Sequence, residues 1–223
     1  MNRISLPVGT DNVSEKTVAM KKKLVNPSDI AFTSTVKAIQ DRKGSRRAYA
    51  KMEENGGWDT TITPELAAFI AAQISVFLGT ANAEGQPYIQ HRGGPPGFLH
   101  VIDETTLAFA DFRGNRQFIT QGNLAENPKA HLFLIDYTQQ QRVKIWGEAS
   151  VVENDAELLA KLMPQNYKSC GEQVILFNVH TWNANCQQHI PQRFEAADVE
   201  RLLAQRDQRI AELEAQIIRL KER

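Results

Sequence analysis

The sequence has few cysteines and no long apolar run, and each shortage excludes a class of protein. Its 223 residues include only two cysteines, Cys170 and Cys186, too few for a disulfide framework or for a zinc site of their own. No stretch approaches the roughly 18 consecutive apolar residues of a membrane span. The first thirty residues also lack the apolar run and the small-residue cleavage site of a secretory signal. We therefore expect a cytoplasmic protein, free of the membrane, with unpaired thiols.

The chain also has no excess of charge of either sign. Its 26 Lys and Arg residues balance 26 Asp and Glu residues, so the formal net charge is zero. A dedicated nucleic-acid binder relies on surplus cations that face phosphates. We therefore expect no nucleic-acid partner. The 42% hydrophobic content is enough for a substantial core.

The common catalytic signatures are absent as well. The sequence contains no Gly-x-Gly-x-x-Gly after a strand, no phosphate-binding Gly-Lys-Ser/Thr, no Gly-x-Ser-x-Gly and no His-Glu-x-x-His. Its five histidines occur singly, without the spacing of metal ligands. We predict no metal site, and any function must come from polar residues that are distributed along the chain.

Periodicity divides the chain into three parts. Residues 1–28 show no sustained period and are expected to form an irregular arm. Apolar residues over 29–49 fall at helical spacing that is interrupted near Gly44, which predicts one helix or two. Thr63 followed by Pro64 predicts the start of another helix, with the threonine as its N-cap. The main domain is expected to cover residues 29–195, and a C-terminal helix the last part, 196–223.

From residue 75 onward the period becomes that of β-strands. Segments rich in β-branched and aromatic residues predict six or seven strands, at 75–80, 87–91, 98–102, 106–110, 130–137, 142–152 and 174–182. Two helices are expected between them, over 115–125 and 155–163, and each is followed by a proline that ends it. Short strands joined mostly by tight turns favour an antiparallel barrel or sandwich.

The last thirty residues carry a heptad pattern. Leu203, Ile210 and Ile217 fall at the a positions, and Arg206, Leu213 and Leu220 at the d positions. In a parallel pair of helices, Arg209 at g would face Glu214 at the following e position. A coiled coil and a single amphipathic helix packed on its own domain are equally good interpretations, because about three heptads is near the minimum for such a prediction.

Three short segments place cationic side chains at strand ends. Arg92 directly precedes two glycines, which would let a ligand approach the backbone. Arg113 and Arg116 lie at a predicted strand-to-helix junction, where backbone N–H groups and arginines can hold a phosphate. Arg142 and Lys144 share one face of a strand. Each segment alone reads as a solvated strand end, but together they favour a phosphate-bearing cofactor.

These segments, in this order, resemble the FMN-binding split-barrel family of pyridoxamine 5'-phosphate oxidase, over roughly residues 60–195. The family's Pro-x-x-Arg strand is matched by Pro87-Tyr88-Ile89-Gln90, with Arg92 two residues on. Its phosphate-gripping Ser-Arg-Lys turn is matched by Asn115-Arg116-Gln117. Its Arg-Gln-Val-Arg-x-x-Gly strand is similar to residues 141–147. Its C-terminal Trp and Arg-Leu-His-x-Arg motif are similar to Trp182 and to residues 189–193. The Gln-His-Arg-Gly-Gly-Pro-Pro-Gly segment at 90–97, together with residues 113–116 and 185–191, resembles the subgroup of oxidase-related FMN-binding proteins.

The resemblance implies an α+β antiparallel split β-barrel with flanking helices and a homodimer that binds FMN at its interface. It assigns no catalytic residue. The residues that it implies as FMN contacts are Gln90, His91, Arg92, Arg113, Asn115, Arg116, Gln117, Arg142, Lys144, Trp182, His189 and Arg193. Of these, Trp182 and Arg193 would reach the flavin ring from the partner chain.

Departures from the family concern the substrate. True oxidases of this kind bind the substrate phosphate with a Tyr, an Arg and a Ser. At the corresponding positions this sequence has Ala160, Pro164 and Lys168. A buried dianion without a bidentate partner would be poorly compensated, so pyridoxamine phosphate is not the expected substrate.

We therefore expect an FMN-dependent oxidoreductase of an unidentified small molecule, with electrons coming from NAD(P)H or passing to oxygen. A non-catalytic flavin-binding or flavin-sensing module and a heme-handling protein are the alternatives.

Overall fold

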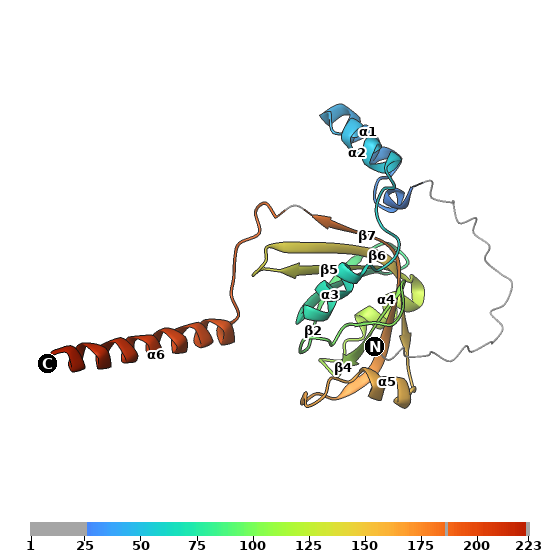
Figure 1. Cartoon of the computed structure of the whole chain (residues 1–223). Coiled ribbons are helices and arrows are strands. Elements are labelled where there is room, and N and C mark those ends of the chain that lie inside the picture. The colour runs from blue at the N-terminus through green and yellow to red at the C-terminus, as the bar shows by residue number, and fades with distance from the viewer. Residues whose placement is uncertain (1–25, 186, 222–223) are drawn as a thin grey trace. The chain divides into compact units, whose positions relative to one another are not determined.

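The computed structural model describes residues 26–185 and 187–221 (Figure 1). Most of the expected N-terminal arm, together with Cys186, therefore lies outside the described residues. The chain divides into two compact units. The first runs up to residue 135 and continues over Arg142–Asn185, and the second combines Asp136–Gln141 with the chain after residue 185. Within the described residues, no helix has the length and apolar character needed to cross a membrane.

Helices precede the sheet. A short 3-10 turn, η1 (Pro27–Ile30), leads into α1 (Ser34–Lys43) and α2 (Arg46–Glu54). There are two helices here because Gly44, at φ 79°, ends α1 in the left-handed conformation that a glycine adopts without strain. The third helix, α3 (Pro64–Ala72), begins where the sequence predicts, with the Thr63 hydroxyl accepting the Leu66 N–H at 3.2 Å.

Within the part of the chain that the structure describes, seven strands form one sheet in the order β2-β1-β5-β6-β7-β4-β3. The strands are β1 (Ser75–Ala81), β2 (Pro87–Gly93), β3 (His100–Val101), β4 (Thr106–Phe112), β5 (Lys129–Asp136), β6 (Gln141–Val152) and β7 (Gly171–Asn185). Neighbouring pairs such as β1–β2, β1–β5, β4–β7 and β6–β7 are antiparallel. All seven predicted strands are present, and the α+β antiparallel prediction is confirmed.

Two helices interrupt the strands, as expected. They are α4 (Ile119–Glu126) and α5 (Ala156–Leu162). The predicted start of the first at residue 115 is wrong by four residues. Arg116 and Phe118 adopt left-handed backbone angles, φ 59° and 54°, so residues 113–118 form an irregular turn instead of a first helical turn.

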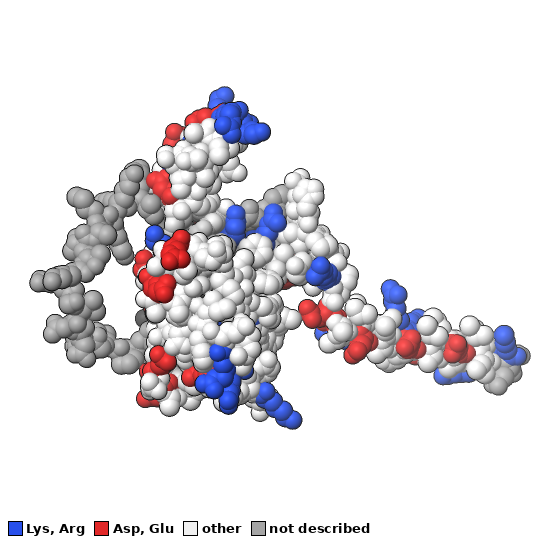
Figure 2. Space-filling model, turned by 180° about the vertical axis from the view of Figure 1, so that it is seen from behind, with Lys and Arg blue, Asp and Glu red and all other residues white. Residues whose placement is uncertain are grey.

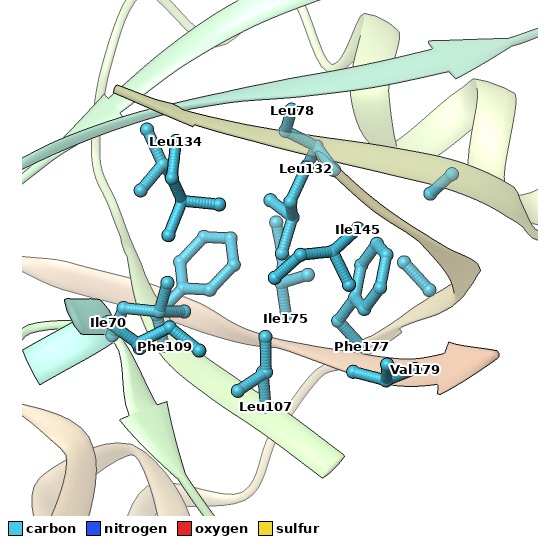
Figure 3. Close-up of a cluster of buried hydrophobic side chains, with 14 of the residues drawn as sticks. Ile70, Leu78, Leu107, Phe109, Leu132, Leu134, Ile145, Ile175, Phe177 and Val179 are labelled. Atoms are coloured by element: carbon cyan, nitrogen blue, oxygen red, sulfur yellow. The ribbon is translucent and has the colours of Figure 1, made fainter. Parts of the chain in front are cut away.

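The main core lies on the concave side of the sheet (Figure 3). Alternate residues of the strands point inward, such as Val76 and Leu78 on β1 and Leu132 and Leu134 on β5. The apolar side of α3 covers one end through Ile70. A second cluster packs α5 against the outer side of β4 and β7, so these two strands are buried on both faces. This double burial explains the nearly continuous apolar run of β4.

A glycine allows the long strands β6 and β7 to pair closely. Their register shifts between Trp146 and Gly147, and a side chain at Gly147 would overlap the backbone carbonyl of Asn178. The extra residue of this bulge is His180 on β7, and the alternation of β6 continues past it.

The second unit holds together through its own contacts. The Arg193 guanidinium lies 4.4 Å from the centre of the Tyr137 ring, and the Gln140 side chain donates to the Ile190 carbonyl at 2.6 Å. The Thr138 hydroxyl donates to the Arg193 carbonyl at 3.0 Å. This unit also contains α6 (Ala196–Lys221), the long C-terminal helix that the heptad pattern predicts.

Candidate functional site

One face of β2 and the turn after β4 line a common pocket, which we call the β2 pocket. Tyr88, Gln90 and Arg92 alternate along β2 and so point to the same side. Residues 114–121 supply the opposite wall, and Asp111, Phe112, Glu172 and Gln173 supply the floor and rim. The structure thus brings together Gln90, Arg92, Asn115, Arg116 and Gln117, five residues that the sequence proposed as cofactor contacts.

A second cavity, of about 240 Å³, adjoins this pocket and shares part of its lining. His91 and Arg113, two more of the predicted site residues, lie along it together with the aromatic rings of Phe98 and Phe109. The His91 ring nitrogen Nε2 lies 2.8 Å from the Ser75 hydroxyl. The adjoining cavity is therefore polar at its β2 side and apolar at its base.

A buried ion pair lies at the centre of the site. Arg92 Nη1 is 3.1 Å from Asp111 Oδ1, with 15% and 11% of the two side chains exposed. The other carboxylate oxygen, Asp111 Oδ2, accepts a hydrogen bond from Gln173 Nε2 at 3.0 Å. Since β2 is the first strand of the sheet order and β4 the last but one, this pair joins two strands that share no backbone hydrogen bonds.

The ion pair leaves hydrogen-bonding capacity unused. Among the described residues, Arg92 Nε and Asp111 Oδ1 are buried and have no hydrogen-bond partner. Buried polar atoms without partners are rare in native proteins, because each costs desolvation energy. Asp111 Oδ1 nevertheless lies beside the Arg92 guanidinium, so the two groups stabilise each other mainly through their charges.

The turn after β4 presents donors at the mouth of the pocket. Asn115 Oδ1 accepts the Gln117 N–H at 3.3 Å, which fixes the turn. Arg116 is half exposed, and its Nε lies 3.3 Å from Glu172 Oε1. Arg116 and Phe118 have left-handed backbone angles, which give this turn its irregular path.

The charges of the β2 pocket nearly cancel. Arg92 and Arg116 are each paired with a carboxylate, Asp111 and Glu172. The exposed Arg113 adds one further positive charge beside the adjoining cavity. A phosphate-bearing cofactor fits the residue types of this lining, because the guanidinium groups of Arg92 and the half-exposed Arg116 line the same pocket.

The third predicted segment forms a separate cluster on β6. Arg142, Lys144 and Trp146 share one face, as expected, but none of them lines either cavity. Trp146 stacks on Trp58 at 4.8 Å, and Lys144 Nζ lies 5.5 Å from its ring centre. Burial, and secondarily the charge of Arg142, lowers the pKa of Lys144.

A histidine that the sequence did not single out completes this cluster. The His131 ring meets the edge of Trp146 at 4.9 Å. Burial, and secondarily the charge of Lys144, lowers the pKa of His131 to about 4. β5 and β6 are neighbouring strands. The contact between His131 and Trp146 depends on how the residues of these two strands are paired, and the sequence alone does not show that pairing.

The remaining predicted site residues lie elsewhere. Trp182 donates its indole N–H to the Thr61 carbonyl at 2.8 Å and packs against the main core. His189 is exposed, with a left-handed φ of 65°, and Arg193 covers Tyr137; both belong to the second unit. Contacts of Trp182 and Arg193 with a partner's flavin stay a prediction.

Sequence reasoning missed the carboxylates of the site. Asp111 stands inside a segment that it singled out, but the pairing of Asp111 with Arg92 depends on how the sheet curves. Glu172 and Gln173 reach the pocket because β7 pairs with β4, with Gln173 opposite Asp111. No local signal in residues 171–173 indicates that register.

The antiparallel sheet, its helices and a pocket between β2 and the turn after β4 define a split-barrel protein. A family model described as "Pyridoxamine 5'-phosphate oxidase" matches residues 62–187, more than half of the chain. The chain therefore belongs to the pyridoxamine 5'-phosphate oxidase family, as its motifs indicate. No curated protein matches it.

The solved structures similar to this chain include three proteins, two of which have names that mention FMN or heme. HupZ of Group A Streptococcus is 21% identical, with 60% of this chain and 99% of that one covered and a TM-score of 0.45. An FMN-binding protein from Syntrophomonas wolfei is 14% identical, with coverage of 66% and 97% and a TM-score of 0.41. HutZ, the heme storage protein of Vibrio cholerae, is 18% identical, with coverage of 54% and 89% and a TM-score of 0.36. These likenesses assign no ligand to this chain.

Proposed function

We propose that this protein is an FMN-dependent oxidoreductase that works as a homodimer on a small molecule other than pyridoxamine phosphate. The observation that supports this best is the convergence of the polar face of β2 and the 113–118 turn on one pocket. Two arginines from separate hairpins, Arg92 and Arg116, line it, and phosphate recognition needs such cations.

Each side chain has a distinct part in holding FMN. The Arg116 guanidinium and the N–H groups of its turn bind the phosphate at the mouth of the pocket. Arg92, fixed by Asp111, adds a positive charge to the lining of the same pocket. Gln90 accepts the Thr120 hydroxyl at 3.0 Å through Oε1, which leaves its amide N–H₂ to donate to the ligand. The flavin, when bound, supplies the hydride chemistry, and these residues supply position and charge.

The dimer completes the site in this proposal. The β2 pocket is too open to enclose the whole cofactor, so a second subunit would cover the flavin ring. Trp182 and Arg193 of the second copy, with Arg142 and Lys144, are the candidates for this cover, as the family resemblance implies.

The choice of substrate follows from what surrounds α5. Oxidases that use pyridoxamine phosphate need an arginine there to bind the phosphate, whereas Ala160, Pro164 and Lys168 occupy the corresponding positions. We expect kcat/KM for pyridoxamine phosphate to fall below the usual enzymatic range of about 10⁴ M⁻¹s⁻¹. A coupled oxidase assay above that value would contradict this part of the proposal.

The cofactor is tested by purifying the full chain without added ligand. We expect a yellow protein with absorption bands near ~370 and ~450 nm, the bands of an oxidised flavin, and FMN as the mass released on denaturation. Arg116→Gln should lose most of the FMN, whereas Arg42→Gln, at an exposed position of α1, should retain it. A Soret band would instead support heme handling, and a colourless protein that takes up no FMN would contradict the proposal.

Catalysis is tested separately on the yellow protein. Bleaching of the ~450 nm flavin band by NADPH, with recovery in air, supports the oxidoreductase. If FMN is bound but neither NADPH nor NADH bleaches it, the non-catalytic flavin-sensing alternative is favoured.

A further inference from the structure

The helix α6 exposes an apolar seam. None of its 26 residues is buried. Its apolar a and d side chains are all exposed, from Leu213 at 41% to Leu220 at 70%, and so are Leu202 and Ile218 outside the seam. A lone helix gains most of its stability from packing an apolar face, and within its own unit this seam has no such contact.

We propose that α6 pairs with α6 of a second copy as a parallel two-stranded coiled coil. The residue types at the core positions select this geometry. Ile210 and Ile217 occupy consecutive a positions, and Leu213 and Leu220 occupy the matching d positions. β-Branched residues at a with leucine at d favour parallel dimers over trimers and tetramers.

Charges beside the seam distinguish parallel from antiparallel pairing. In the parallel pair, Arg209 at g faces Glu214 at e of the partner, twice by symmetry. An antiparallel pair with the same core layers would instead place Asp207 beside Glu214, which repel each other. Figure 2 shows both signs of charge distributed along α6, with uncharged side chains between them. The arrangement therefore penalises the antiparallel alternative.

The existing contacts of Arg209 do not compete strongly with this pairing. Arg209 Nη1 lies 3.0 Å from Glu212 Oε2 in the same helix, and both side chains are largely exposed, at 61% and 48%. Such exposed pairs, three residues apart on a helix, contribute little to stability. Arg209 can therefore turn to Glu214 of the second copy at small cost.

One core position is polar and fixes the register. Arg206 occupies a d position between Leu203 and Ile210. In the parallel pair, Asp207 of the second copy lies at the neighbouring e position and offsets the arginine charge. A single polar residue in the seam costs stability but excludes shifted registers, which would bury it against apolar side chains.

Disulfide trapping in the full chain tests this proposal. In a background with Cys170 and Cys186 replaced by serine, Leu213→Cys should cross-link to its own copy at least ten times faster under mild oxidation than Gln208→Cys. Both substitutions lie on α6, but position 208 is at f, on the side opposite the seam. Equal rates for the two variants would overturn the proposal, because a dimer formed by the split barrel alone favours neither face of α6.

The pairing direction is tested by charge reversal and by mixing. Arg209→Glu should slow cross-linking of Leu213→Cys, and adding Glu214→Arg should restore it. Cross-linking between Ile210→Cys and Leu213→Cys chains that exceeds cross-linking of either variant with itself would show antiparallel pairing and overturn the proposal. The inference is independent of the flavin, because these rates are measured without regard to FMN content.

Discussion

At the scale of single residues, the ion pair between Arg92 and Asp111 has two roles. It connects β2 to β4, and it fixes the Arg92 side chain, which lines the β2 pocket. The pair is largely buried, with about one-seventh of the arginine side chain and less of the carboxylate exposed. Removing one partner of such a pair leaves an uncompensated charge, which costs more than the pair itself contributes.

We therefore predict that Asp111→Asn lowers the free energy of unfolding by about 1–3 kcal/mol, measured by chemical denaturation of the apoprotein. Glu172→Gln is the matched control, because its partner Arg116 is half exposed and surface pairs contribute about 0–1 kcal/mol. Equal effects of the two substitutions would mean that Arg92 is solvated in the folded protein.

His131 makes stability depend on pH. Burial, with help from Lys144, lowers its pKa from 6.5 to about 4. Between these values the unfolded chain binds more protons than the folded one, so the free energy of unfolding decreases as the pH falls from about 6.5 to about 4. The loss attributable to this histidine is at most about 3 kcal/mol, because one pKa unit corresponds to about 1.4 kcal/mol.

The test is an NMR titration of the His131 ring together with unfolding curves at several pH values. In Lys144→Met the pKa should rise but stay below 6.5, since burial is the larger cause. His131→Phe should flatten the stability profile across this pH range. A His131 midpoint near 6.5 in the wild-type protein would refute the burial that this account assigns to the ring.

At the scale of elements, strands were easier to predict than the turns that carry the site. Alternation in β1 and β6 identifies each strand and its inward face, because a period of two needs no tertiary information. The turn at 113–118 is different: its left-handed Arg116 and Phe118 are residue types that rarely adopt such angles. Local propensity therefore predicts a helix there, and the tertiary structure overrides it.

Two glycines give opposite predictions for replacement by alanine. At Gly147 a Cβ would overlap the Asn178 carbonyl across the β6–β7 bulge. We expect Gly147→Ala to lower the melting temperature by roughly 10 °C or more, or to prevent folding.

Gly122 lies inside α4 with no atom near its Cβ position. There alanine should stabilise by about 0.5–1 kcal/mol, because it has the higher helix propensity.

Thermal unfolding of both variants followed by circular dichroism separates these outcomes. A Gly147→Ala protein as stable as the wild type would show that β6 and β7 do not approach each other as closely as described. A destabilised Gly122→Ala protein would contradict the open surroundings of α4.

At the scale of the whole molecule, the β2 pocket depends on the curvature of the sheet. The sequence places Arg92 and Arg116 at strand ends, and the family resemblance suggests that they meet. It could not show that each would have a carboxylate beside it. Asp111 reaches Arg92 through the curvature of the sheet, and Glu172 reaches the pocket through the pairing of β4 with β7. Arg142 and Lys144 show the opposite case. The period of two along a strand predicts that they share one face. Their absence from the pocket lining depends on the order of the strands in the sheet, which the period does not give.

The central claim is that this pocket binds FMN through its phosphate. The most direct measurement compares the affinities of apoprotein for FMN and for riboflavin, which lacks the phosphate, by isothermal titration calorimetry. We predict that the wild-type chain binds FMN at least ~10-fold more tightly, a difference of about 1.4 kcal/mol, and that Arg116→Gln removes most of this preference. Equal affinity of the wild-type chain for the two flavins, or an unchanged preference in Arg116→Gln, would contradict the account.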